Sequence, residues 1–212
     1  MDFLNAFVAL ANYVLVPGIA YGSQLALGAL GVTLVYGILR FSNFAHGDTM
    51  ALGAMSAVLI TWGFQAIGLH LWVLPTALIA LPFAIMVTIG LLLGTDRLVY
   101  RFYREKKAKP VIFVIVSLGI MFIYNGITRF IIGSDDKNFA DGERFIISAR
   151  TFKKMTGLEE GLAIKTTQGL TVITAIIVVV VLFWFLNKTR SGKSMRAYSD
   201  NEDLALLSGI NP

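Results

Sequence analysis

A short polar segment, residues 40–48 (RFSNFAHGD), separates two long apolar stretches and constrains how this chain can fold. No Lys, Arg, Glu or His occurs from Phe3 to Leu39, and the only strongly polar side chains from Thr49 to Gly94 are Gln65 and His70. Burying such polar groups in lipid without partners is costly, on the order of several kcal/mol for each group. The polar segment is therefore either a short loop at the membrane surface or a functional kink within the bilayer.

Composition indicates a polytopic membrane protein. The 212 residues are 56% hydrophobic and only 15% charged, and the mean hydropathy is +0.73, which is too apolar for an ordinary soluble domain. Apolar runs of about 18 residues or more are typical of transmembrane helices. We expect an all-α membrane helix bundle with about five spans. They are residues 20–39, 50–67, 71–93, 111–132 and 167–186.

Residues 3–17 precede the first predicted span and are apolar but short. Because Pro17-Gly18 interrupts them, we expect an interfacial or partly inserted lead-in segment. The first three residues lack the basic segment of a signal peptide, so we expect this apolar run to remain in the mature protein.

Basic residues predict the orientation of the spans. Residues 95–110 hold six basic and two acidic residues, and four basic residues follow the last span within residues 188–196. By the positive-inside rule both segments are cytoplasmic. Alternation of sides then places residues 40–48 on the cytoplasmic side and residues 133–166 in an external loop.

The chain ends in a predicted cytoplasmic segment, residues 191–211, with helix signals of its own. Ser191-Gly192 is expected to break the chain, Ser199 and Glu202 have capping-box spacing, and Gly209 suits a left-handed helix stop. Leucines between them form an apolar patch rimmed by charge, which is typical of a docking site. Packing of the patch against the protein's own loops is the alternative.

Two stretches together resemble the permeases of branched-chain amino acid ABC importers. The first is residues 21–48, where the match runs from Leu25 through Tyr36-Gly37 to Asn43-Phe-Ala-His-Gly47. The second is residues 189–211, which resembles that family's cytoplasmic coupling segment. In it the matching positions are Gly192, Arg196, Ala197, Ala205, Gly209 and Ile210.

The resemblance implies a permease subunit of the bacterial cell or inner membrane that imports branched-chain, hydrophobic amino acids. Its expected partners are two ATP-binding subunits, a second permease subunit and an extracytoplasmic substrate-binding protein. Family members continue past the coupling segment with further spans, so we expect an incomplete permease domain. A permease for urea or short-chain amides is the first alternative. A secondary transporter driven by an ion gradient is less favoured, since Arg129 is the only charged residue in the fourth span.

The resemblance also implies two groups of site residues. We expect the coupling segment to contact an ATPase through Gly192, Arg196, Ala197, Glu202, Leu206, Leu207 and Gly209. In the polar segment, Asn43, His46, Gly47 and Asp48 either shape the translocation path or lock the junction between two helices. The junction is favoured, because Asp48-Thr49 can begin the next helix and complement its dipole.

Several other classes of function find no support in the sequence. A glycine-rich phosphate loop with Lys does not occur, so we expect no cofactor on this chain and ATP on partner subunits. No catalytic arrangement and no metal site is predicted, since only His46 and His70 carry imidazoles, on opposite sides of the membrane, and cysteine is absent. The net charge of +5 fits basic cytoplasmic loops beside the lipid bilayer, and we expect no binding of nucleic acid.

Overall fold

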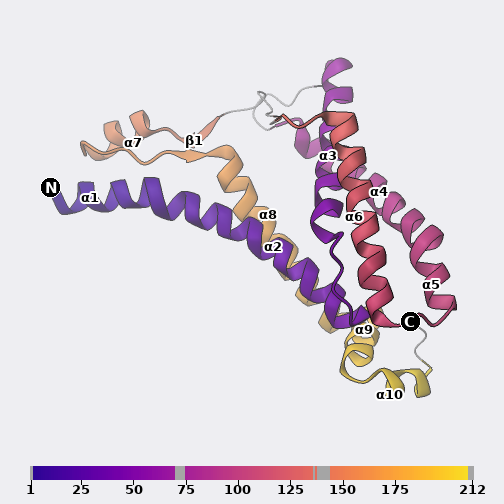
Figure 1. Ribbon diagram of the computed structural model, residues 1–212. Helices are drawn as coiled ribbons and strands as arrows, with labels where there is room; N and C mark the ends of the chain where they lie inside the picture. Colours follow the sequence, from indigo (N-terminus) through magenta and orange to yellow (C-terminus); the bar gives the residue numbers. More distant parts are fainter. Residues whose placement is uncertain (1, 70–74, 136, 138–143, 210–212) are drawn as a thin grey trace. The chain divides into compact units, whose positions relative to one another are not determined.

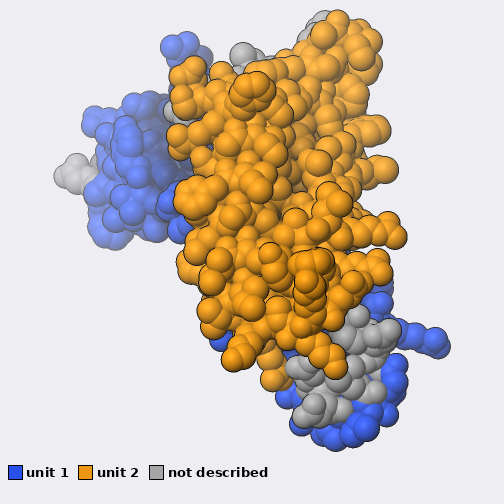
Figure 2. Space-filling view, turned by 45° about the vertical axis from the view of Figure 1, so that its right-hand side comes forward, with its two compact units in different colours: residues 1–38, 143–212 blue, residues 39–142 orange. Residues whose placement is uncertain are grey.

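The computed structural model describes residues 2–69, 75–135, 137 and 144–209 (Figure 1). The chain divides into two compact units, residues 1–38 with 143–212 and residues 39–142 (Figure 2). Within the described residues, five helices are long and apolar enough to cross a membrane, which confirms the predicted all-α bundle of about five spans. They are Phe3–Leu39, His46–Ala66, Ala77–Glu105, Pro110–Ile132 and Thr166–Lys188.

The first helix is longer than the sequence predicted. Helix α1 (Asp2–Leu10), the π-helical turn η1 (Ala11–Leu15) and α2 (Val16–Leu39) follow one another without interruption. The prediction of a separate lead-in ending at Pro17 is therefore wrong. A proline has no N–H, and its ring crowds the carbonyl four residues earlier. The wider π-helical turn η1 includes Tyr13, four residues before Pro17, and so gives room for that ring where the helix continues.

The segment predicted as an external loop contains regular structure. Strand β1 (Phe145–Ile147) pairs antiparallel with β2 (Ile164–Lys165), and α7 (Ala149–Thr156) lies between them. Ser148 is the N-cap of α7, and its Oγ accepts a hydrogen bond from the Thr151 N–H. We call residues 144–165 the cap.

Two asparagines of the first helix hold the cap. The Ala163 N–H donates to Oδ1 of Asn12 at 2.9 Å, and the Glu160 N–H donates to Oδ1 of Asn5 at 3.5 Å. Asn12 belongs to the π-helical turn η1. Figure 1 shows the cap running alongside the start of the first helix. Backbone N–H groups of the cap are thus bonded to side chains of this helix.

Three helices end the chain: α8 (Thr166–Lys188), α9 (Arg190–Asp200) and α10 (Glu202–Leu207). The break after α8 lies at Thr189, whose backbone is extended, and not at Ser191-Gly192 as the sequence predicted. Thr189 Oγ1 accepts a hydrogen bond from the Gly192 N–H at 3.0 Å. Threonine is a good N-cap, so it fixes the start of α9.

The predicted capping box is also wrong in its first residue. Ser199 stays within α9, whereas Asn201 is extended, and its Oδ1 accepts a hydrogen bond from the Leu204 N–H at 3.1 Å. Asparagine and serine are comparable N-caps, and only the observed break in the chain decides between them. The side chain of Glu202 lies outside the described residues.

The second unit is built from α3 (His46–Ala66), α4 (Ala77–Thr95), η2 (Asp96–Tyr100), α5 (Arg101–Glu105) and α6 (Pro110–Ile132). Helix α3 packs against both α4 and α6. Its start at His46 brings part of the polar segment into the helix, four residues before the predicted span. Pro110 occupies the first position of α6, as predicted, because that position needs no N–H donor.

The apolar core of this second unit lies where α3 meets α6. Its buried members are Ala45, Leu52, Met55, Ile120 and Tyr124. The core therefore begins directly at the polar segment, which places residues 40–48 against packed side chains.

Candidate functional site

The polar segment starts with an aromatic anchor. Arg40 has a φ of +53°, a left-handed conformation that ends the preceding helix and turns the chain. Phe41 is buried. Its ring stacks on Phe113 with centroids 5.3 Å apart and lies 6.1 Å from the ring of Tyr100. This packing fixes the chain at the entry to the segment.

Asn43 shapes the turn that follows. Its Oδ1 accepts a hydrogen bond from the Ala45 N–H at 3.0 Å, and its carbonyl accepts one from the His46 N–H at 3.3 Å. The hydroxyl of Tyr100 donates to the same Oδ1 at 3.5 Å. Asparagine side chains commonly stabilise such turns. Asn43 therefore folds the segment onto the start of α3.

Two side chains of α6 form hydrogen bonds with the polar segment. The Phe44 N–H donates to Ser117 Oγ at 3.1 Å. Asn125 Nδ2 donates to Asp48 Oδ1 at 3.0 Å. Asp48 lies in the first turn of α3, where a negative charge also interacts favourably with the helix dipole.

His46 and Gly47 are positioned differently from Asp48. His46 is the first residue of α3, half-buried, and its carbonyl accepts a hydrogen bond from Thr49 Oγ1 at 2.6 Å. Gly47 is exposed, and a Cβ built on it would meet nothing within 4 Å. The packing of this unit therefore does not require a glycine at that position.

The structure thus brings Asn43 into contact with η2 and Asp48 into contact with α6. Among the described residues, no group of three His, Asp or Glu side chains lies close enough together to hold a metal ion. His70 lies outside the described residues. The polar segment is thus joined to α6 and η2 by hydrogen bonds.

Sequence analysis missed the partners of this segment: Tyr100, Phe113, Ser117 and Asn125. Asn125 gave a usable signal, because an amide within an apolar span needs a partner. Ser117 gave none, since a serine can bond its own helix, as its Oγ does to the Val114 carbonyl at 2.7 Å.

The segment predicted to couple to an ATPase, residues 191–211, begins with a close backbone approach at Gly192. A Cβ on this residue would collide with the carbonyl oxygen of Phe185 and lie 2.6 Å from Cα of Leu186. Only glycine lets α9 turn back this closely onto the end of α8. The tight corner between α8 and α9, which we call the elbow, therefore depends on Gly192.

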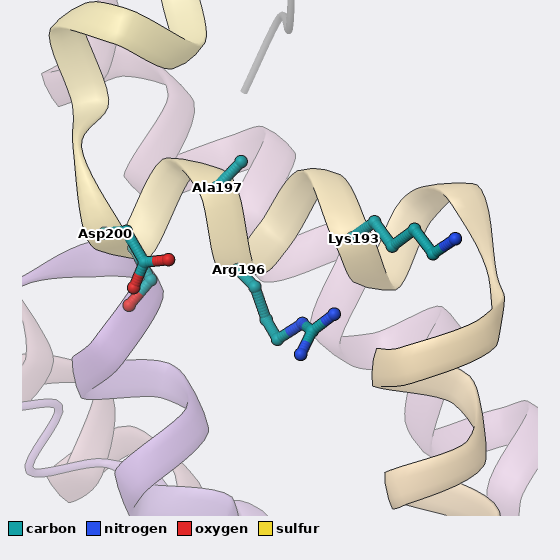
Figure 3. A pocket seen from close by; sticks show the side chains of 5 residues that line it. Lys193, Arg196, Ala197 and Asp200 are labelled. Atoms are coloured by element: carbon teal, nitrogen blue, oxygen red, sulfur yellow. The ribbon is translucent and has the colours of Figure 1, made fainter.

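Charged residues line one face of α9. Lys193, Arg196, Ala197 and Asp200 lie at helical spacing along it and border a shallow, open hollow, shown in Figure 3. Arg196 Nη1 donates to Asn187 Oδ1, on α8, at 2.9 Å. Arg196 thus links α9 to α8 across the elbow.

The short helix α10 exposes apolar side chains. Ala205 is buried, whereas Leu204 and Leu207 are 61% and 85% exposed. Gly209 has a φ of +80°, which confirms the predicted left-handed stop. The side chain of Leu206 lies outside the described residues.

The elbow also lies beside the first helix of its own unit. A Cβ on Gly37, near the end of α2, would lie 3.6 Å from Ser199 Oγ of α9. Gly37 and α9 belong to the two stretches on which the resemblance to importer permeases rests. Those stretches meet in the folded chain.

The chain is similar to known permeases over most of its length. Residues 14–212 match the family model described as branched-chain amino acid transport system / permease component. The high-affinity branched-chain amino acid transport system permease protein LivH of Escherichia coli is 27% identical over 198 residues, which cover 92% of this chain and 60% of LivH. LivH of Salmonella typhimurium gives the same values.

A third relative is the high-affinity branched-chain amino acid transport system permease protein BraD of Pseudomonas aeruginosa. It is 28% identical over 208 residues, which cover 93% of this chain and 62% of BraD. The chain thus spans about three fifths of the length of these relatives. No solved structure matches it. On the family match and the five apolar helices, this multi-pass membrane protein belongs to the permease-component family of branched-chain amino acid transport systems.

Proposed function

We propose that this chain is a membrane-spanning permease subunit of an ATP-driven importer for branched-chain, hydrophobic amino acids. The observation that carries the proposal is the match of residues 14–212 to the permease family, which runs through the spans and the elbow alike. The relatives named above are permeases of branched-chain amino acid transport systems. In this proposal the spans line the path of the substrate and the chain itself catalyses no reaction.

ATP is hydrolysed by two partner subunits, and this chain binds no cofactor or metal. A second permease subunit completes the path, and an extracytoplasmic binding protein delivers the substrate. The elbow transmits ATPase movement to α8, because Gly192 and Arg196 join α9 closely to the end of that span. Ala197, Glu202, Leu206, Leu207 and Gly209 form the rest of the contact surface.

Leu207 offers a sharp test of the docking surface. It is 85% exposed, so Leu207→Asp should leave folding intact but abolish co-purification of the ATPase subunits with the tagged chain. Met155→Asp is the matched control, because Met155 is 82% exposed on α7, in the segment expected outside the membrane. Equal recovery of ATPase with both variants would contradict docking through α10.

Arg196→Ala tests coupling itself. In the assembled importer we expect ATP hydrolysis to persist while uptake falls at least fivefold, since α9 loses its link to Asn187. Lys193→Ala removes a neighbouring charge that makes no such hydrogen bond in the described residues and should retain uptake. Wild-type coupling in Arg196→Ala would argue against the elbow as the transmitting element.

The substrate is tested by uptake of labelled leucine, isoleucine and valine into cells with and without the gene. Excess urea or acetamide should not compete, and competition by either would point to an importer of short amides. ATP depletion should stop uptake, whereas collapse of the ion gradients at constant ATP should not. The reverse pattern would favour a secondary transporter.

A further inference from the structure

A basic patch lies at one end of the third apolar helix. We define it as the six cations Arg97, Arg101, Arg104, Lys106, Lys107 and Lys109, which all have exposed side chains. Two acidic residues, Asp96 and Glu105, lie in the same stretch, so the patch carries a net charge of about +4 (six cations less two anions). It belongs entirely to the second unit.

The length of the helix places this patch at the membrane surface. The apolar helix runs from Ala77 to Glu105, 29 residues, and such a helix is roughly 40 Å long at about 1.5 Å per residue. The hydrocarbon core of a bilayer is only about 30 Å thick. The last turns of the helix, which carry the three arginines, therefore extend into the level of the lipid headgroups, and the three lysines follow directly after its end.

The two acidic residues are already paired within the patch. Arg104 Nη1 and Nη2 donate to the two carboxylate oxygens of Asp96 at 2.6 and 2.7 Å, and Arg101 Nε donates to Glu105 Oε1 at 2.8 Å. Within the described part of the chain, no acidic residue forms an ion pair with the remaining four exposed cations. They are Arg97, Lys106, Lys107 and Lys109.

Apolar side chains are exposed on the same turns. Leu98 is 82% exposed and Phe102 is 49% exposed, and their spacing of four residues puts them on neighbouring turns. Lys106 Nζ lies 4.1 Å from the centroid of the Phe102 ring. A face with apolar side chains beside long cationic ones suits the boundary between acyl chains and headgroups, because the cations can reach outward while their stems stay in apolar surroundings.

We propose that the basic patch binds the phosphate headgroups of anionic phospholipids, with Arg97, Lys107 and Lys109 as the contacting cations and Leu98 and Phe102 in the acyl region. Lipid is favoured over an acidic protein partner because the exposed apolar side chains share the depth of the cations in the bilayer. Basic residues also orient a chain in the membrane, but that role needs only their charge. It does not explain why Leu98 and Phe102 are exposed beside them. Each cation near an anionic surface strengthens binding about fivefold.

The test uses the chain purified in detergent and titrated with phosphatidylglycerol or phosphatidylcholine. Lipid binding is measured by mass spectrometry of the intact complex and by the rise in Tm. We expect phosphatidylglycerol to bind in preference and to be displaced by salt. Arg97→Gln/Lys107→Gln/Lys109→Gln should lower the affinity for phosphatidylglycerol at least tenfold without changing that for phosphatidylcholine.

The matched control is Arg150→Gln/Lys153→Gln/Lys154→Gln on α7, which removes three exposed cations from another part of the chain. It should retain wild-type affinity. An equal loss of affinity for phosphatidylglycerol in both variants would mean that only net charge matters, and would overturn the proposal. Unchanged affinity in the patch variant would also overturn it. An equal rise in Tm with inorganic phosphate, at the same concentration of phosphate groups, would also overturn the proposal. The site would then need no lipid. A Tm of the patch variant equal to that of wild type in phosphatidylcholine shows that it folds.

Discussion

Asn125 Nδ2 donates a 3.0 Å hydrogen bond to Asp48 Oδ1 and so joins α6 to the first turn of α3. The two residues are 77 positions apart in the sequence, and both are half-buried. This contact and the hydrogen bond between Phe44 and Ser117 both bind the polar segment to α6.

Exchanging the two side chains tests this junction. Asn125→Asp alone places two carboxylates together and should lower the Tm clearly. Asp48→Ala alone should cost about 1–3 kcal/mol, because Asn125 loses a charged partner. The double variant Asp48→Asn/Asn125→Asp restores one amide and one carboxylate and should recover most of the stability. Thermal unfolding in detergent measures all three, and a double variant no better than Asn125→Asp would argue against a direct pair.

Ser117→Ala should destabilise the chain by about 1–2 kcal/mol. The substitution leaves the Phe44 N–H without its acceptor in a part-buried place. Ser23→Ala is the control, since Ser23 Oγ donates to the Ile19 carbonyl of its own helix at 2.8 Å and bonds no other group among the described residues. Thermal unfolding of the two variants should differ. Equal Tm values would mean that water satisfies the Phe44 N–H.

Gly192→Ala should disrupt the elbow. The added Cβ collides with backbone atoms of Phe185 and Leu186, which cannot move away as a flexible side chain can. We expect a loss of about 3 kcal/mol or more and a lower level of folded protein in the membrane. Gly22→Ala has open space around its Cβ and should be stable. A stable Gly192→Ala variant would show that α9 leaves α8 at a wider angle.

Substitutions of His46 and Gly47 distinguish a transport role of the polar segment from a structural one. Gly47→Ala meets nothing within 4 Å, and alanine favours a helix over glycine by up to about 1 kcal/mol. Its protein level should therefore be unchanged or higher. A fall in uptake at constant level would show that a substrate or partner approaches Gly47. For His46→Ala, a loss of protein level alone would support the helix junction, and a changed uptake affinity at constant level would support the path.

Local signals predicted the elements whose cause is local. Apolar runs predicted five membrane-crossing helices, Pro110 the first turn of α6 and Gly209 a left-handed stop, and the structure confirms each. The break predicted at Pro17 was wrong, because a π-helical turn makes room for the proline ring and the helix continues. Ser199 was chosen over Asn201 because both are good caps and the sequence does not reveal where the chain is extended.

The sequence by itself determined that this chain is a helical membrane protein and where its polar segment lies, because hydrophobic length and residue spacing act over a few turns. Only the tertiary structure decided which groups the polar segment contacts. Ser117 and Asn125 lie 73 and 77 residues from their partners, so their pairing depends on how α6 packs against α3. A buried polar group must find a partner, but packing alone selects which one.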